Sequence, residues 1–72
     1  MSQQRDGITY GYLAARYCRL RLPIKVLQSG AGYYIGTWND GPCSRESQEY
    51  YPNKESAQSA LTNNTFTQRE SP

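Results

Sequence analysis

The stretch CRLRLPIKV, residues 18–26, alternates apolar and polar positions along its whole length. Its apolar positions are Cys18, Leu20, Leu22, Ile24 and Val26, and the positions between them are Arg19, Arg21, Pro23 and Lys25. A repeat of two residues is typical of a β-strand that buries one of its faces. Because proline has no N–H to donate, this strand must lie at a sheet edge at Pro23 or be broken there. We therefore expect the protein to be built around a sheet.

Two further strands are predicted to follow as hairpins. Residues 33–38, YYIGTW, are aromatic and β-branched and favour a strand. The preceding SGAG segment favours a turn. The pair Asp40-Gly41 is a strong hairpin signal, because a type I′ turn needs positive φ at both central residues. Residues 43–51 then form the third predicted strand, and the sheet is expected to be antiparallel.

A helix is predicted over residues 54–62. Asn53 can cap its first turn, and Glu55 in that turn suits the positive end of the helix dipole. Apolar residues recur at the spacing of one helical face, and they are Ala57, Ala60 and Leu61. This face predicts a short amphipathic helix that packs on the sheet.

The chain of 72 residues is long enough for one domain of the α+β class, with a three-stranded antiparallel β-sheet packed against one C-terminal α-helix (β-β-β-α). We expect this domain at residues 17–69, a flexible or partly ordered N-terminal arm at 1–16, and a disordered tail at 70–72. Residues 8–16 of the arm fit a short helix and an irregular segment equally well. The predicted core consists of Leu20, Leu22, Ile24, Val26, Ile35, Ala57, Leu61 and Phe66.

The composition limits the functions that are open to this chain. Apolar residues make up only 36% of it, and seven Tyr and one Trp supply much of the area that can be buried. Cys18 and Cys43 are its two cysteines, too few for a metal quartet, and we expect two reduced thiols in the cytoplasm. No apolar run approaches the roughly 20 residues of a membrane span. We expect no cofactor and no membrane partner.

Tyr34-Ile35-Gly36 matches half of the fingerprint of the GIY-YIG nucleases. The other half should be a Gly-Ile-Tyr strand one short hairpin earlier. The nearest match, residues 7–10, is interrupted by Thr9 and lies too far upstream. Those nucleases also need an Arg on the following helix, whereas Arg45 falls in a predicted strand. We therefore interpret the motif as the middle of a hairpin, with Gly36 at a bulge or a close packing position.

The sequence contains no other catalytic pattern. It has no His, the usual general base near neutral pH. Its glycines do not stand between a strand and a helix, as a phosphate loop requires. Residues 44–47, SRES, place hydroxyls beside charges, and we expect them to form a solvated strand. We predict that the protein is not an enzyme and has no small-molecule substrate.

Two groups of residues are candidates for binding. The polar side of the first strand could neutralise phosphates and stack on bases, and it consists of Arg19, Arg21 and Lys25, with Arg16 and Tyr17 nearby. Five of the eight basic residues lie within residues 1–30, against one of the six acidic residues. The second group combines residue types that are enriched at protein interfaces, and it consists of Tyr33, Tyr34, Trp38, Arg45, Tyr50 and Tyr51.

The motifs GYYIGT and SRES, within residues 22–69, resemble a family of small proteins from bacteria, phages and plasmids that has no assigned chemistry. This resemblance implies a mobile element as the source and transfers no catalytic residue. A weaker likeness, at the level of the fold, is to the arm-binding N-terminal domain of lambda-type integrases. That domain is also β-β-β-α, has a Gly-Tyr-Tyr like residues 32–34, and lays its sheet in the DNA major groove. Glu46 and Glu49 make the third strand less basic than such a sheet.

These observations support two hypotheses about function. The first is a small non-enzymatic accessory module that binds a protein partner or associates with itself as a homodimer. The alternative is a nucleic-acid-binding domain that uses a basic and aromatic sheet face.

Overall fold

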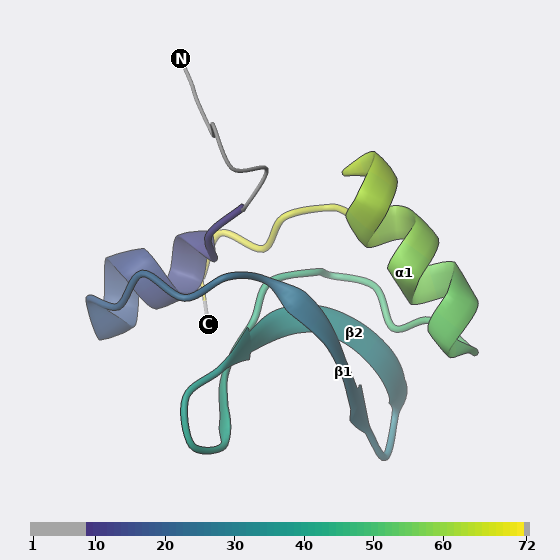
Figure 1. Ribbon diagram of the computed structural model, residues 1–72, viewed down its shortest axis with the longest axis horizontal. Coiled ribbons are helices and arrows are strands. Elements are labelled where there is room, and N and C mark those ends of the chain that lie inside the picture. Colours follow the sequence, from purple (N-terminus) through teal and green to yellow (C-terminus); the bar gives the residue numbers. More distant parts are fainter. Residues whose placement is uncertain (1–8, 72) are drawn as a thin grey trace.

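The computed structural model describes residues 9–71 and shows a three-stranded antiparallel sheet with one C-terminal α-helix. In chain order the elements are η1 (Ala14–Cys18), β1 (Lys25–Ser29), β2 (Gly32–Trp38), β3 (Pro42–Arg45) and α1 (Lys54–Asn63). The strands lie in the order β1-β2-β3, and the predicted α+β class is confirmed. Helix α1 packs on β1 and β2, whereas η1 packs on β3. Figure 1 shows α1 on one side of the sheet and both hairpin tips pointing away from it.

The first strand is shorter than the alternation predicted. β1 begins only at Lys25, because the residues before it pair with the N-terminal segment. The Leu22 carbonyl accepts a hydrogen bond of 2.9 Å from the Gly11 N–H, and Tyr10 forms an isolated bridge with Pro23. The strand is thus broken at Pro23, one of the two outcomes that its missing N–H allowed.

From Leu20 to Val26, apolar positions of the alternating stretch are still more buried than the polar positions between them. The prediction of the core is nevertheless wrong for most of its residues. Ile35 and Ala57 are fully buried. The other predicted core residues are only half-buried, namely Leu20, Leu22, Ile24, Val26, Leu61 and Phe66. The buried apolar residues are Leu13, Ala14, Tyr34, Ile35, Ala57 and Ala60. The core therefore lies nearer to the N-terminal segment and β2 than the sequence suggested.

Residues 12–18, which fitted both a helix and an irregular segment at their start, are helical and contribute to the core. A helical turn at residues 12–13 continues as the π-helix η1, which ends at Arg19 with φ of 59°. Leu13 is only 2% exposed and Ala14 is fully buried. The expected boundary between arm and domain, at residue 16, falls inside η1. Residues 1–8 of the expected arm, and Pro72 of the expected tail, lie outside the described residues.

The two hairpin turns use the residues that the sequence indicated. Asp40 and Gly41 have φ of 60° and 137°, so both carry the positive φ that the sequence indicated. The loop between the paired Trp38 and Pro42 has three residues, 39–41, one more than a type I′ turn. Gly32 opens β2 with φ of 133°, and a Cβ there would lie 2.9 Å from the Tyr51 carbonyl oxygen. Glycine is therefore needed at this position, both because φ is positive and because a Cβ has no room.

The third strand ends at Arg45, well before the predicted end at residue 51. The N–H groups of Glu46 and Ser47 both donate to the Ile35 carbonyl, at 2.8 and 3.0 Å, and this shared acceptor ends the regular ladder. Ser47 then forms an isolated bridge with Gln68. Residues 46 and 47 thus turn inward from the strand, and both side chains are fully buried.

Helix α1 matches the predicted helix to within one residue at its end. The side chain of Asn53 accepts a hydrogen bond of 2.8 Å from the Ser56 N–H, which confirms the predicted cap. Asn64, with φ of 56°, ends the helix in the left-handed conformation. Ala57 and Ala60 are buried, so the predicted apolar face packs on the sheet.

Candidate functional site

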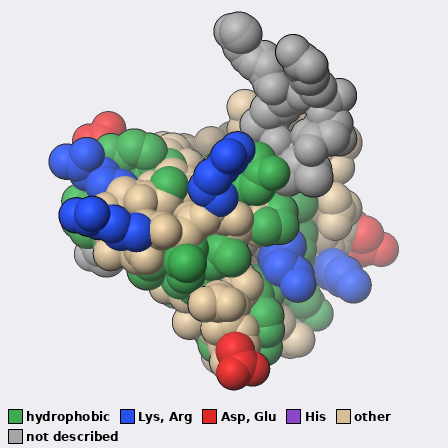
Figure 2. All heavy atoms as spheres, turned by 60° about the vertical axis from the view of Figure 1, so that its left-hand side comes forward, with side chains coloured by type: hydrophobic (Ala, Val, Ile, Leu, Met, Phe, Trp, Pro, Cys, Tyr) green, Lys and Arg blue, Asp and Glu red, His purple; other side chains and the backbone are tan. Residues whose placement is uncertain are grey.

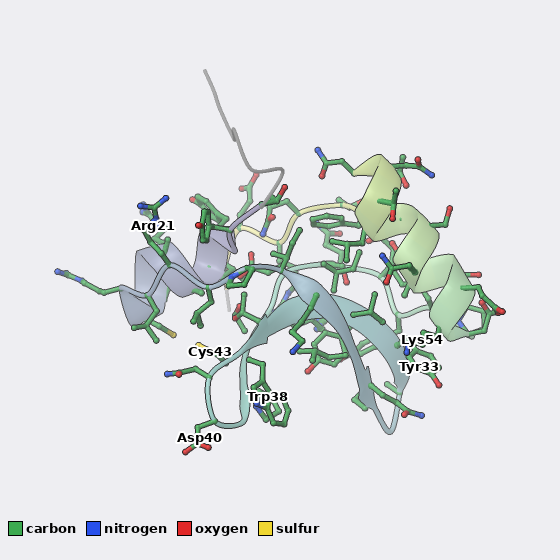
Figure 3. The ribbon with its side chains drawn as sticks, in the orientation of Figure 1. Arg21, Tyr33, Trp38, Asp40, Cys43 and Lys54 are labelled. Atoms are coloured by element: carbon green, nitrogen blue, oxygen red, sulfur yellow. The ribbon has the colours of Figure 1, made fainter. Side chains whose placement is uncertain are left out.

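The sheet has one face that turns away from α1. Successive residues of a strand point to opposite faces, and paired residues of antiparallel strands share a face. Figure 3 shows Trp38 on the side away from α1, and Tyr34 and Gly36 alternate with it along β2. Their partners on β1 and β3 are Lys25, Leu27 and Arg45, and Trp38 pairs with Pro42. We name this side the open face, and it consists of Lys25, Leu27, Tyr34, Gly36, Trp38 and Arg45, with Tyr50 in contact.

An aromatic and cationic cluster forms one part of the open face. The Arg45 guanidinium lies 4.5 Å from the centre of the Tyr50 ring, and Tyr50 meets Tyr34 edge-on with ring centres 5.9 Å apart. Nη1 of Arg45 also donates to the Ser47 and Gln48 carbonyls at 3.1 and 3.0 Å. Tyr34 is only 7% exposed, and burial raises the pKa of its hydroxyl. Tyr34 is therefore a core residue that supports Tyr50, and it offers little contact surface of its own.

Trp38 is the most exposed aromatic residue of the open face, with 48% of its surface accessible. It stands at the end of β2, where a register shift between Thr37 and Trp38 interrupts the pairing with β3. Burial of an indole ring is favourable, so a partner that covers the exposed ring of Trp38 would gain binding energy. Trp38, Tyr50 and Arg45 are the residue types that dominate protein interfaces, and here they share one face.

Gly36 is a close packing position within this face. A Cβ at Gly36 would collide with the Ser44 carbonyl oxygen and would lie 2.9 Å from the Tyr34 ring. One of the two interpretations of the Tyr-Ile-Gly motif, close packing at its glycine, is therefore confirmed. In this fold the motif builds the middle strand and seats the Tyr34 ring.

On the opposite side of the sheet, the carboxylate of Glu46 forms a buried polar centre. It accepts hydrogen bonds from the N–H groups of Leu13 (3.0 Å) and Ala14 (3.2 Å). The Ser44 hydroxyl donates to it at 2.6 Å and the Gln68 amide at 2.8 Å. The prediction of a solvated SRES strand is wrong, because Glu46 and Ser47 are fully buried.

Hydrogen bonding keeps Glu46 ionised in this setting. Burial opposes the charge, but the donors of Leu13, Ser44, Gln68 and Ala14 hold the pKa of the carboxyl below its usual value. With both oxygens occupied and no exposed surface, Glu46 anchors the N-terminal segment to β3. The sequence carries one signal of this role in Gly11, where a Cβ would lie 2.6 Å from a Glu46 oxygen.

The basic residues that the sequence analysis grouped together lie in two parts of the structure, around η1 and in β1. Arg16 and Tyr17 lie in η1, and Arg19 and Arg21 lie in the segment after it. All four are exposed, and so is Lys25, which alone belongs to a strand. The prediction of one basic strand face is therefore wrong, because β1 starts at Lys25.

Aromatic rings accompany the arginines around η1. The Arg21 guanidinium lies 4.6 Å from the centre of the Tyr10 ring, and that of Arg16 lies 5.8 Å from the centre of the Tyr17 ring. Figure 2 shows Lys and Arg side chains spread over this side of the molecule, with apolar side chains between them and acidic groups at the edges. A surface of this composition can attract an anionic partner.

Two of the predicted interface residues, Tyr33 and Tyr51, lie away from the open face. Both are half-buried, and their backbones pair at the start of α1. Figure 3 shows Tyr33 beside Lys54 at this helix end. A shallow depression of about 540 Å³ lies there, and its lining consists of Tyr33, Pro52, Asn53, Lys54, Glu55 and Gln58. The aromatic group predicted from the sequence is therefore split between two sides of the domain.

The two cysteines, which are far apart in the sequence, meet in the structure. The Cys43 thiol donates to Sγ of Cys18 over 3.4 Å, and neither residue is in a disulfide. This hydrogen bond, followed by burial, raises the pKa of the Cys18 thiol. Within residues 9–71 the structure contains no cluster of three or more His, Cys, Asp or Glu side chains that could hold a metal ion.

No family model, curated protein or solved structure matches this chain. In the part of the chain that the structure describes, no helix has the length and apolar character needed to cross a membrane. The arrangement of this chain's own residues is therefore what indicates a function.

Proposed function

We propose that this protein is a small, non-catalytic binding module that contacts a protein partner through the open face of its sheet. The observation that carries the proposal is the common location of Trp38, Tyr50 and Arg45 on the side away from α1. Large rigid rings lose little conformational freedom on binding, and a guanidinium stacked on a ring is already oriented. This face therefore resembles a preorganised interface.

The charges of the open face indicate which partner suits it. Lys25 and Arg45 are its charged members, and both are basic. A symmetric dimer through this face would bring two copies of each cation together with no carboxylate of the face to offset them. A partner that presents apolar and acidic side chains fits better than a second copy.

Non-catalytic action is part of this proposal. The sequence has no His, and the buried carboxylate of Glu46 is fully engaged with backbone and side-chain donors. Two thiols outside disulfides suit the cytoplasm.

Nucleic-acid binding through the surface around η1 is the second candidate. Arg16, Arg19 and Arg21 are exposed, and tyrosine rings lie beside two of them. Residues 9–39 contain no acidic residue, so the phosphate backbone would meet no repulsion from this part of the chain.

One set of variants separates the two candidates. Trp38→Ala/Tyr50→Ala removes the rings of the open face, and Arg19→Ala/Arg21→Ala is the matched change around η1. Each protein is used as bait, and any captured protein is purified and its affinity for each bait is remeasured by calorimetry, because the first variant lacks Trp38, the only tryptophan. Binding lost in the first variant and kept in the second supports the protein partner.

The same proteins are titrated with duplex and single-stranded oligonucleotides at two salt concentrations. Binding to duplex DNA should weaken by roughly 0.9 log units per neutralised phosphate for each log unit of salt. Salt-steep binding that Arg19→Ala/Arg21→Ala abolishes would replace the first candidate with the second. A sizing run of the wild type shows whether it is a stable dimer, and the emission of Trp38 shows whether that dimer buries the ring, which would make the partner a second copy.

A further inference from the structure

We propose that Cys18 and Cys43 form a reversible intramolecular disulfide by exchange with a small-molecule disulfide such as glutathione disulfide. The bond would fasten η1 to β3. In a reducing environment both residues remain thiols, as the structure has them. The inference is independent of the proposed partner, because it uses no residue of the open face.

The two sulfurs are close enough for a small rearrangement to join them. Their separation is 3.4 Å, and a disulfide bond measures about 2.05 Å, so the remaining approach is roughly 1.4 Å. Figure 3 shows the Cys43 side chain directed from β3 toward η1. Rotation of the two side chains can close such a distance without a change of fold.

The fold holds this pair in place from elements that are distant in the sequence. η1 packs on β3, and Glu46 fastens the start of the helix through the N–H groups of Leu13 and Ala14. Cys43 is the residue skipped by the register shift, since Ser44 pairs with Thr37 and Pro42 with Trp38. A bulged residue has no partner on the neighbouring strand, so its side chain can be aimed out of the ladder.

The pair is also accessible to a reagent in solution. Cys18 is exposed and Cys43 is half-buried. Arg16 and Arg19 stand on either side of Cys18 in the sequence and are exposed. Their positive charge favours approach of the anionic glutathione disulfide.

The exchange balances without any further reactant. The thiolate of one cysteine attacks glutathione disulfide, forms a mixed disulfide and releases one glutathione thiolate. The second protein thiolate then attacks the protein sulfur of that mixed disulfide and releases the second glutathione. The new S–S bond joins Cys18 to Cys43, and two electrons and two protons pass from the protein to glutathione disulfide, which leaves as two glutathione thiols.

The test is an equilibrium in glutathione redox buffers, read by intact mass and by peptide mapping. The native protein should lose two hydrogen atoms, and the map should connect Cys18 with Cys43. Folding preorganises the pair, so the effective concentration of one thiol for the other should be at least roughly tenfold higher in the native than in the denatured protein. The Tm should rise on the order of 10 °C upon oxidation.

Cys43→Ser and Cys18→Ser are the matched controls, and each should stop at a mixed disulfide with glutathione without the rise in Tm. The comparison of native with denatured wild-type protein keeps the test decisive even if a serine variant folds poorly. Mixed disulfides that persist on both cysteines of the wild type would overturn the inference. So would disulfide-linked dimers, or an effective concentration that is the same in both states.

Discussion

The carboxylate of Glu46 accepts a hydrogen bond from the backbone N–H of Leu13, a residue 33 positions earlier in the chain. This contact joins the first described segment to the end of β3. It also explains why a glutamate within a run of polar residues is fully buried. The N–H groups at the start of a helix have no partner within the helix, and a carboxylate is a strong acceptor for them.

Glu46→Ala should destabilise the protein by about 3 kcal/mol, because it leaves the N–H groups of Leu13 and Ala14 buried without an acceptor. Glu46→Gln keeps the shape but replaces one acceptor by a donor, and it should cost about 1–2 kcal/mol. Urea unfolding measures both changes. Glu70→Gln, at an exposed position, is the control and should stay within about 0.5 kcal/mol of the wild type.

Stability should fall in acid, and Glu46 should account for part of that fall. Its pKa is lower in the folded protein than the value of 4.5 for an unperturbed side chain, and that of Glu49 is shifted in the same direction. The stabilisation is therefore complete above the unfolded pKa and is lost as the pH falls through the folded pKa. Melting curves between about pH 6 and about pH 3 should show a shallower decline for Glu46→Gln. If the wild type and Glu46→Gln lost stability equally as the pH falls, Glu46 would not contribute to the loss of stability in acid.

Gly11→Ala should destabilise the protein by roughly 1–3 kcal/mol, because its Cβ would lie 2.6 Å from both Glu46 and Thr37. Gly30→Ala is the matched control in the first hairpin turn, where a Cβ meets no atom within 4 Å and φ is not positive. That control should be neutral or stabilising by up to about 1 kcal/mol. Equal effects of the two substitutions would contradict the packing around Glu46.

Substitution of Tyr34 should cost much more stability than substitution of Tyr50, although the two rings are in contact. Tyr34→Ala removes a buried ring and should cost about 3–5 kcal/mol. Tyr50→Ala and Trp38→Ala remove exposed rings, and each should cost less than about 1 kcal/mol in the free protein. Thermal unfolding provides the comparison, and a large cost at Trp38 would mean that its ring supports the fold.

The protein should not cleave DNA. Tyr34 of the Tyr-Ile-Gly motif is buried beneath Tyr50, and Arg45 is engaged with the Tyr50 ring and two carbonyl groups. Incubation of the pure protein with Mg²⁺ and plasmid DNA should leave the plasmid intact. Cleavage that disappears in Tyr34→Phe would revive the nuclease interpretation.

Features that depend on neighbouring residues could be predicted from the sequence. The Asp40-Gly41 turn and the helix capped by Asn53 follow from backbone preferences within a few positions. The missing N–H of Pro23 also limited the first strand to two outcomes, a sheet edge or a break, and the structure shows the break.

The way in which these elements pack together could not be predicted from local sequence. The burial of Leu13 and Glu46, the early ends of β1 and β3, and the meeting of Cys18 with Cys43 all depend on groups far apart in the chain. Such contacts leave no periodic pattern in the sequence, because a buried glutamate and a solvent-exposed one can have the same neighbouring residues. The open face was likewise settled by strand register, which placed Lys25 and Arg45 on either side of Gly36.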